Sequence, residues 1–255
     1  MRFTMPSTSI DISEEDGVRY LHFGSEWVQG AMRIRRPVDL ELAYTREMMA
    51  GLLLRDATRW PKKILLIGLG AASLTKFCYW KLPHSKLRVV EIDAEVVAAA
   101  RHFFKMPDTD RRLGITIGDG VEYICQDGPA FDYILVDGYD ENARVGALDS
   151  LPFYQACRAR LAPEGLVSVN LFGRSNRYGP SLKRLAEAFD GRTLAFPSCD
   201  SGNVVAFAGN TSTTVELAQL KERAAALRTN TGLDLRPTVK RLVASGLVED
   251  GLLRI

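Results

Sequence analysis

The middle of the chain alternates between short apolar runs and amphipathic stretches. Runs rich in branched apolar residues are typical of strands buried on both faces of a parallel sheet. Such runs are found at residues 64–67, 87–92, 115–117, 133–136 and 166–171. Stretches with a helical spacing of apolar residues follow them, at 71–79, 94–104, 121–126, 151–161 and 178–189. This alternation predicts an α/β fold with a doubly wound, mainly parallel, Rossmann-like sheet.

The N-terminal part of the chain has a different pattern. Residues 1–16 look like a polar lead. Two strands are expected at 18–23 and 27–34, with Gly24 and Ser25 between them as a hairpin signal. A helix is expected over residues 40–54, which carry a helical spacing of apolar residues.

Two more strands are expected near the C-terminal end, at 192–196 and 203–208. From Thr213 onward the pattern predicts helices, with a break at 232–237. We therefore expect three parts. They are a small N-terminal β-hairpin plus helix over 1–55, an α/β domain over 56–212 and a helical extension over 213–255.

The composition excludes several classes of protein but does not indicate a function. Of the 255 residues, 46% are hydrophobic and 25% charged, and the net charge of +2 gives no general case for binding nucleic acid or a membrane. The four cysteines are widely spaced, and the three histidines lack the spacing of metal ligands. No apolar run is long enough for a membrane span, and the first residues lack the apolar segment of a secretory signal. We expect a cytoplasmic protein that holds no metal.

A glycine turn follows the first strand of the expected sheet. Gly68 and Gly70 come directly after the run 64–67, and Glu91 ends the next strand 21 residues past Gly70 (91 − 70). Such a turn places a nucleotide against a helix N-terminus, and an acid at this spacing accepts hydrogen bonds from both ribose hydroxyls. A plain strand–helix–strand crossover without ligand is the alternative. Ser73 stands where a dinucleotide fingerprint has its third glycine, which weakens the case for NAD and leaves adenosine-type ligands open.

Glycines and acids follow four consecutive strands of the expected sheet. Ligands of such sheets bind at the carboxyl ends of the strands. The residues at these ends are Gly68, Gly70, Glu91, Asp93, Gly118, Asp119, Gly120, Asp137 and Asp140. A single acid at such a place is more often the N-cap of a helix, and we expect this simpler role for Asp93.

Several of these motifs together resemble the catalytic domain of spermidine synthases, the polyamine aminopropyltransferases. The motifs are IGLGAAS, VEID, IGDGVEYI, DYILVDGYD and FYQACRARLAPEGLV, with WVQ before them and PSCDSGNVVAFA after them. The resemblance covers residues 18–209. It implies a class I methyltransferase-like fold behind a small β domain and a homodimer or larger homo-oligomer.

The resemblance implies roles for the nucleoside-binding residues. Glu91 holds the ribose hydroxyls, Asp119 accepts from the adenine amino group, and Gln29 lies near the thioether end of the nucleoside. Gly68, Gly70 and Gly120 shape the turns around the ligand.

It also implies roles at the amine end. Asp137 receives the proton of the attacking amine, Tyr44 orients that amine, and Asp140 sits at the far end of the polyamine. The chemistry agrees with these roles, because a diamine is doubly protonated near neutral pH, with amine pKa values of about 10 by analogy with lysine. A carboxylate binds the cation and takes its proton, and the sulfonium leaving group needs no further activation.

The chain departs from the family pattern in its polyamine half. Ala71 stands where the family's glycine loop carries an acid near the aminopropyl group, and Glu141 replaces the proline after Asp140. Residues 170–173 read NLFG in place of a stretch rich in glutamine and glutamate. The nucleoside half looks intact and the polyamine half altered.

We therefore expect a spermidine synthase-like transferase that passes the aminopropyl group of an S-adenosyl sulfonium compound to a polyamine. The co-substrate is decarboxylated S-adenosylmethionine or S-adenosylmethionine itself. The alternatives are an S-adenosylmethionine-dependent methyltransferase and a catalytically silent nucleoside-binding homologue, which Ala71 suggests. An NAD oxidoreductase fits least well.

Overall fold

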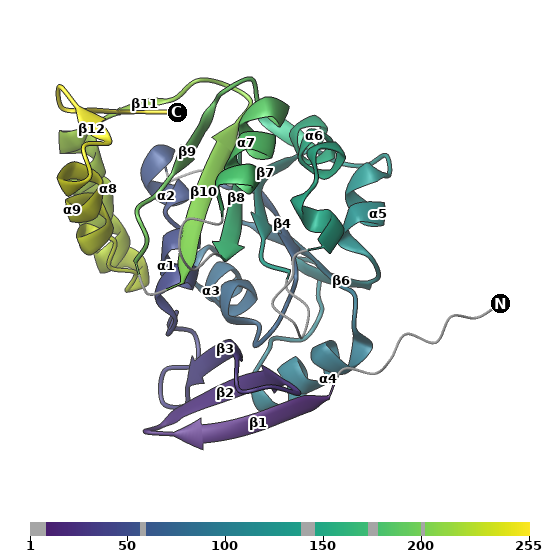
Figure 1. The fold of residues 1–255 in the computed structure, drawn as a ribbon. Coiled ribbons are helices and arrows are strands. Elements are labelled where there is room, and N and C mark those ends of the chain that lie inside the picture. The colour runs from purple at the N-terminus through teal and green to yellow at the C-terminus, as the bar shows by residue number, and fades with distance from the viewer. Residues whose placement is uncertain (1–8, 57–59, 139–145, 173–177, 200–201) are drawn as a thin grey trace.

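The core of the molecule is a seven-stranded sheet with helices on both faces (Figure 1). The computed structural model describes residues 9–56, 60–138, 146–172, 178–199 and 202–255. The strand order is β6-β5-β4-β7-β8-β10-β9, in which β4 to β8 are parallel and β10 is antiparallel to β8 and β9. The expected doubly wound, mainly parallel sheet is confirmed.

The strands of this sheet are β4 (Lys63–Ile67), β5 (Lys86–Glu91), β6 (Leu113–Ile117), β7 (Phe131–Val136), β8 (Leu161–Phe172), β9 (Thr193–Ala195) and β10 (Asn203–Gly209). The helices around it are α3 (Ser73–Lys81), α4 (Ala94–Phe103), α5 (Gly120–Cys125), η1 (Gly146–Asp149), α6 (Leu151–Ala159) and α7 (Gly179–Ala188). Two further helices, α1 (Ala43–Met48) and α2 (Gly51–Leu54), precede the sheet in the chain.

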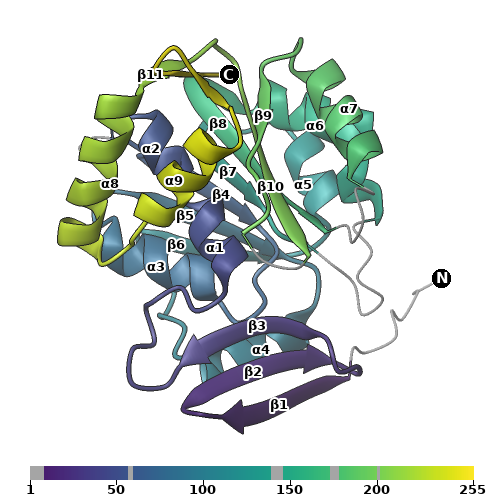
Figure 2. The ribbon, with the colours of Figure 1, turned by 60° about the vertical axis from the view of Figure 1, so that its left-hand side comes forward.

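Side chains alternate between two cores along each central strand. In β4, Ile64 and Leu66 join one cluster, while Leu65 and Ile67 join the other. Figure 2 shows α5, α6 and α7 on one side of the sheet and α1, α2 and α3 on the opposite side. Both faces of β4 are therefore covered, which is why its sequence is a continuous apolar run.

The N-terminal part is a three-stranded antiparallel sheet, in which the expected hairpin is present as β2 and β3 and is extended by one further strand, β1. β1 (Ile10–Glu15) pairs with β2 (Val18–Phe23), and β2 pairs with β3 (Val28–Arg33). The interpretation of residues 1–16 as a polar lead was wrong for 10–15. β1 is an edge strand whose polar side chains are mostly exposed, and only Ile10 and Ile12 pack against the core. A strand with so few apolar residues gives a weak sequence signal.

The single helix expected over residues 40–54 is broken into α1 and α2. The break is built around the buried hydroxyl of Tyr133, which donates to the carbonyl of Met48 and accepts from the amide of Gly51 at 3.2 Å. A side chain at Gly51 would meet this hydroxyl, because an added Cβ would lie 2.5 Å from it. A tertiary contact thus accompanies the break, and Gly51 is its local sign in the sequence.

The C-terminal part contains more than the expected helices. α8 (Leu217–Thr231) and α9 (Arg236–Ala244) are present, and Gly232 ends α8 with a positive φ. Three short strands, β11 (Thr214–Glu216), β12 (Val248–Glu249) and β13 (Leu252–Arg254), form an additional antiparallel sheet. They are two or three residues long, too short for a period to be recognised in the sequence.

Candidate active site

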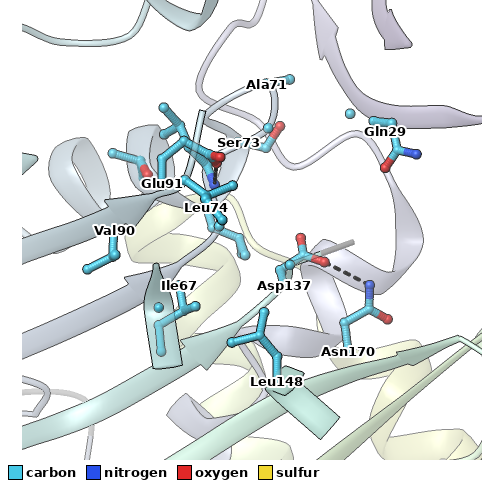
Figure 3. A pocket seen from close by; sticks show the side chains of 18 of the residues that line it. Gln29, Ile67, Ala71, Ser73, Leu74, Val90, Glu91, Asp137, Leu148 and Asn170 are labelled. Carbon is cyan, nitrogen blue, oxygen red and sulfur yellow. Dashed lines mark hydrogen bonds between the residues drawn. The ribbon is translucent and has the colours of Figure 1, made fainter. Parts of the chain in front are cut away.

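The chain changes direction within the sheet between β4 and β7. From β4 it moves outward through β5 to β6, and it then returns to place β7 on the other side of β4. Ligands of open α/β sheets bind at the carboxyl ends of strands at such a switch point. A cavity of ≈ 360 Å³ lies there, a size typical of small-molecule sites (Figure 3).

The glycine turn after β4 brings two strand ends into contact. Gly68 has φ +94°, and a Cβ added there would lie 2.1 Å from the carbonyl oxygen of Asp137. The amide of Asp137 in turn donates to the carbonyl of Ile67 at 2.9 Å. Glycine is needed at 68 for both its backbone angle and this close approach. Gly68 and Gly70, both expected at the site, line the cavity.

Glu91 is a buried carboxylate held by the glycine turn. Its side chain accepts from the amide of Leu69 at 2.8 Å and from the amide of Asp93 at 3.1 Å, and the residue is only 8% exposed. Burial raises the pKa of the Glu91 carboxyl, and the hydrogen bonds from backbone amides oppose that shift. Each carboxylate oxygen has a second lone pair. Glu91 lines the cavity and can therefore still accept from the hydroxyls of a ligand.

Two other strand-end acids cap helices. Asp93 accepts from the amide of Glu95 at 2.8 Å at the start of α4, as expected, and it is not among the described cavity residues. Asp119 accepts from the amide of Val121 at 2.6 Å at the start of α5, and it also lines the cavity. Gly120 lies beside it, where an added Cβ would be 2.5 Å from Cγ2 of Ile67. Both expected residues are thus at the cavity, and the cap uses only part of the acceptor capacity of Asp119.

Asp137 directly follows β7 and lines the cavity. The hydroxyl of Tyr44 donates to its Oδ2 at 3.2 Å. The amide nitrogen of Asn170 donates to its Oδ1 at 2.8 Å (Figure 3). Desolvation raises the pKa of the Asp137 carboxyl, and these two hydrogen bonds oppose the shift. The structure therefore brings Tyr44 and Asp137 together, although 93 residues separate them.

Asn170 and Asn203 are residues that the sequence did not assign to the site. The side-chain nitrogen of Asn203 donates to Oδ1 of Asn170 at 2.8 Å, so the nitrogen of Asn170 is left to face Asp137. Asp137 directly follows β7, while Asn170 lies in β8 and Asn203 in β10, and these strands are neighbours in the sheet. Asn170 was noted only as a departure from the family pattern. A polar residue near the carboxyl end of a buried strand is the sequence signal that could have marked it.

The N-terminal sheet forms one wall of the cavity. Gln29 of β3 lines it, and the hydroxyl of Ser73 donates to the carbonyl of Ala31 at 3.0 Å. Ala71 also lines the cavity, yet it is 2% exposed because it packs against Gly30. Ser73, which replaces the third glycine of the dinucleotide fingerprint, thus ties α3 to this sheet. Asp140, the remaining expected residue, lies outside the described residues.

The described lining of the cavity carries one sign of charge. Its ionisable acids are Glu91, Asp119 and Asp137, and no lysine, arginine or histidine occurs among the lining residues that the structure describes. Carboxylates that line a cavity without basic side chains attract cations. Within the same part of the chain, no group of three or more metal-ligating side chains is found, and no helix has the length and apolar character needed to cross a bilayer.

Comparison with known proteins shows which family the chain belongs to. The family model of the spermine/spermidine synthase domain matches residues 41–171. A polyamine aminopropyltransferase of Neisseria meningitidis is 37% identical over 237 residues, which cover 92% of this chain and 89% of that protein. A polyamine aminopropyltransferase of Chromobacterium violaceum is 37% identical over 234 residues, which cover 91% of this chain and 88% of that protein.

Solved structures share the fold. A probable spermidine synthase from Corynebacterium glutamicum matches with a TM-score of 0.69 at 19% identity and covers 92% of both chains. Human methyltransferase-like protein 13 in complex with SAH matches with a TM-score of 0.67 at 25% identity, covering 75% of this chain and 93% of that chain. The fold resemblance expected from the motifs is thereby confirmed.

Proposed function

The chain belongs to the spermine/spermidine synthase family, and from this premise we propose that it transfers an aminopropyl group from an S-adenosyl sulfonium compound to an amine of a polyamine. One observation carries the proposal. The described lining of the cavity combines three carboxylates with no basic side chain. Both reactants are cations, since the donor has a sulfonium and the acceptor has ammonium groups.

The nucleoside is held by the half of the cavity that β4, β5 and β6 build. Glu91 accepts from the ribose hydroxyls, Asp119 from the adenine amino group, and Gln29 lies near the sulfur. The proposal is supported by the glycine turn, by the free lone pairs of Glu91, and by the human protein of the same fold that binds SAH.

Asp137 takes the proton that the amine must lose. The ammonium form of the acceptor has no lone pair and cannot attack carbon, whereas the neutral amine can. The amine nitrogen then bonds to the carbon next to sulfur, the carbon–sulfur bond breaks, and its electron pair leaves with methylthioadenosine. The raised pKa of Asp137 makes it a better base than an ordinary aspartate, and Tyr44 and Asn170 hold its two oxygens in place. Asp140 binds the distal ammonium of the polyamine.

The donor is decarboxylated S-adenosylmethionine, with ordinary S-adenosylmethionine as a weaker competitor. The cavity favours the more cationic of the two compounds, because decarboxylation removes the one negative charge. Ala71 leaves this choice less strict than an acid at that position does, because a carboxylate there would attract the ammonium of the decarboxylated donor and repel the carboxylate of the ordinary one.

We propose a homodimer or larger homo-oligomer acting in the cytoplasm. The family resemblance supports the assembly. Cys78, Cys125 and Cys157 are free thiols in the structure, which agrees with a reducing compartment.

A thermal-shift panel tests the ligand class. The panel contains decarboxylated S-adenosylmethionine, S-adenosylmethionine, methylthioadenosine, S-adenosylhomocysteine and NAD. We expect the adenosyl sulfur compounds to stabilise the protein by about 2.7 kcal/mol at a hundredfold excess over Kd. NAD is expected to have no effect. Stabilisation by NAD alone would refute the proposal, and stabilisation by S-adenosylmethionine without any effect of the decarboxylated compound would favour methyl transfer.

A further inference from the structure

Tyr44 lies on α1, a helix too short to be stable without packing against other elements. α1 has six residues and no side-chain N-cap, and α2 follows after the break at residues 49–50. Isolated helices shorter than about 12–15 residues are marginal in water. The elements that pack against α1 must therefore fix the position of Tyr44 relative to Asp137. One side of α1 packs on β8 and β10 of the central sheet.

The C-terminal helix α9 contacts α1 through a buried carboxylate. Glu47 is 4% exposed and accepts from the hydroxyl of Thr238 at 2.6 Å, and Arg241 forms an ion pair with the same oxygen. Glu47 follows Tyr44 by three residues, which is less than one helical turn. A shift of α1 at Glu47 must therefore also move Tyr44.

This ion pair is better suited to fixing a position than to adding stability. The Glu47 side chain is 5% exposed, whereas the Arg241 side chain is 31% exposed. Taking a carboxylate out of water costs about as much as its attraction to a partner returns, whereas removing that partner leaves a buried charge and is strongly destabilising. Oε2 of Glu47 and Nε of Arg241 have no hydrogen-bond partner among the described residues. A pair that leaves polar atoms unsatisfied contributes little net stability, but it defines one arrangement of the two helices.

α9 is itself firmly held. Val239 and Leu242 are buried in the main core, and α8 packs against both α9 and α2. Arg223 of α8 also donates to the carbonyl of Leu53 in α2 at 2.8 Å. In both overall views α1 and α2 lie between the central sheet and the pair α8–α9 (Figures 1 and 2). The C-terminal part is therefore an outer support for the segment that carries Tyr44.

We propose that Thr238 and Arg241 are positioning residues of the active site, which act through Glu47 to hold the Tyr44 hydroxyl against Asp137. This inference rests on the proposed function, since it gives the last forty or so residues a part in the amine half of the reaction. Neither residue touches the cavity described above.

Hydrogen–deuterium exchange tests whether α9 stabilises the position of α1, and it needs no assay of activity. Thr238→Val keeps the shape and removes the donor, and Arg241→Met removes the charge. Both are expected to speed exchange in the peptide that contains residues 43–48 and to leave α3 unchanged. Lys240→Met, at an exposed position of the same helix, is the matched control for the loss of a charge and is expected to change neither. Unchanged exchange over residues 43–48 in both variants would overturn the inference.

A double-mutant cycle with Tyr44→Phe tests the link to catalysis. We expect Arg241→Met to lower kcat/KM roughly tenfold or more in the parent, as expected for a misplaced catalytic group, while methylthioadenosine affinity stays unchanged. The same change in the Tyr44→Phe protein is expected to have no further effect, because the group that it positions is already gone. Arg241→Lys is expected to restore part of the activity. Equal losses in the two backgrounds would show that Arg241 does not act through Tyr44.

The two experiments distinguish a failure of the proposed function from a failure of the positioning role of Thr238 and Arg241. If the parent transfers no aminopropyl group, the proposed function fails while the exchange result still decides whether α9 holds α1. If the parent is active and Thr238→Val, which is expected to fold normally, changes neither exchange nor kcat/KM, the inference fails and the function stands.

Discussion

The two halves of the cavity are assembled in different ways. The nucleoside half consists mainly of the turns and acids that directly follow β4, β5 and β6, within residues 68–120. In the amine half, α1 contributes Tyr44, the end of β7 contributes Asp137, β8 contributes Asn170, and β10 contributes Asn203. A half built from local turns depends on a few short segments. A half gathered from four distant elements depends on the packing of the whole molecule.

The largest expected effect is in the amine half. Asp137→Asn removes the proton acceptor but keeps the size of the side chain. We expect turnover to fall roughly a hundredfold or more, while methylthioadenosine binds as it does to the parent. Steady-state kinetics and calorimetry on the same samples measure the two effects. Asp127→Asn, which alters an exposed acid, is the control, and parent-like turnover of Asp137→Asn would remove this residue as the base.

In the nucleoside half, a substitution is expected to weaken ligand affinity more than turnover. Glu91→Gln keeps the shape of the side chain and removes the charge that accepts from the ribose. We expect affinity for methylthioadenosine to fall by about 1.5–3 kcal/mol, the scale of a hydrogen bond to a charged group, with much less effect on turnover at saturating donor. Calorimetry gives the affinity, with Glu122→Gln of α5 as the control. An unchanged dissociation constant would contradict the ribose role.

Ala71 lines the cavity and is expected to set the choice of donor. Ala71→Asp is expected to increase the preference for decarboxylated over ordinary S-adenosylmethionine by about 1–3 kcal/mol. Because Ala71 packs against Gly30, Ala71→Asn is needed to separate the effect of charge from that of size. Dissociation constants for both donors decide the matter. The idea fails if the parent already discriminates strongly and Ala71→Asp adds nothing.

The smallest expected effect is a shift in pH dependence. Asp137 must be ionised to accept a proton, and the hydrogen bond from Asn170 favours the ionised form. Asn170→Leu removes that bond, so the pKa of Asp137 rises further and the acid limb of kcat/KM moves to higher pH. Asn203→Leu is expected to move it in the same direction by less. A limb that stays in place or moves to lower pH in Asn170→Leu would show that this amide does not favour the ionised form.

The same division explains what the sequence predicts well. The parallel sheet, the glycine turn, Glu91 and the Asp93 cap are local patterns, in which residues close in the chain determine each other's structure. The edge strand β1, the break around Tyr133 and the amide chain from Asn203 to Asp137 depend on contacts between distant segments. Tyr44 was expected at the site only through the family resemblance, because nothing in its own surroundings marks it. The roles of the individual residues, including Asp140, stay predictions until variants are measured.

One assay tests the central claim most directly. The purified protein is incubated with a polyamine and either decarboxylated or ordinary S-adenosylmethionine, and the products are identified by mass spectrometry. We predict methylthioadenosine together with an amine that has gained one aminopropyl group, formed with the decarboxylated donor and lost in Asp137→Asn. A methylated product with S-adenosylhomocysteine, formed from ordinary S-adenosylmethionine and without any aminopropyl transfer, would contradict the account.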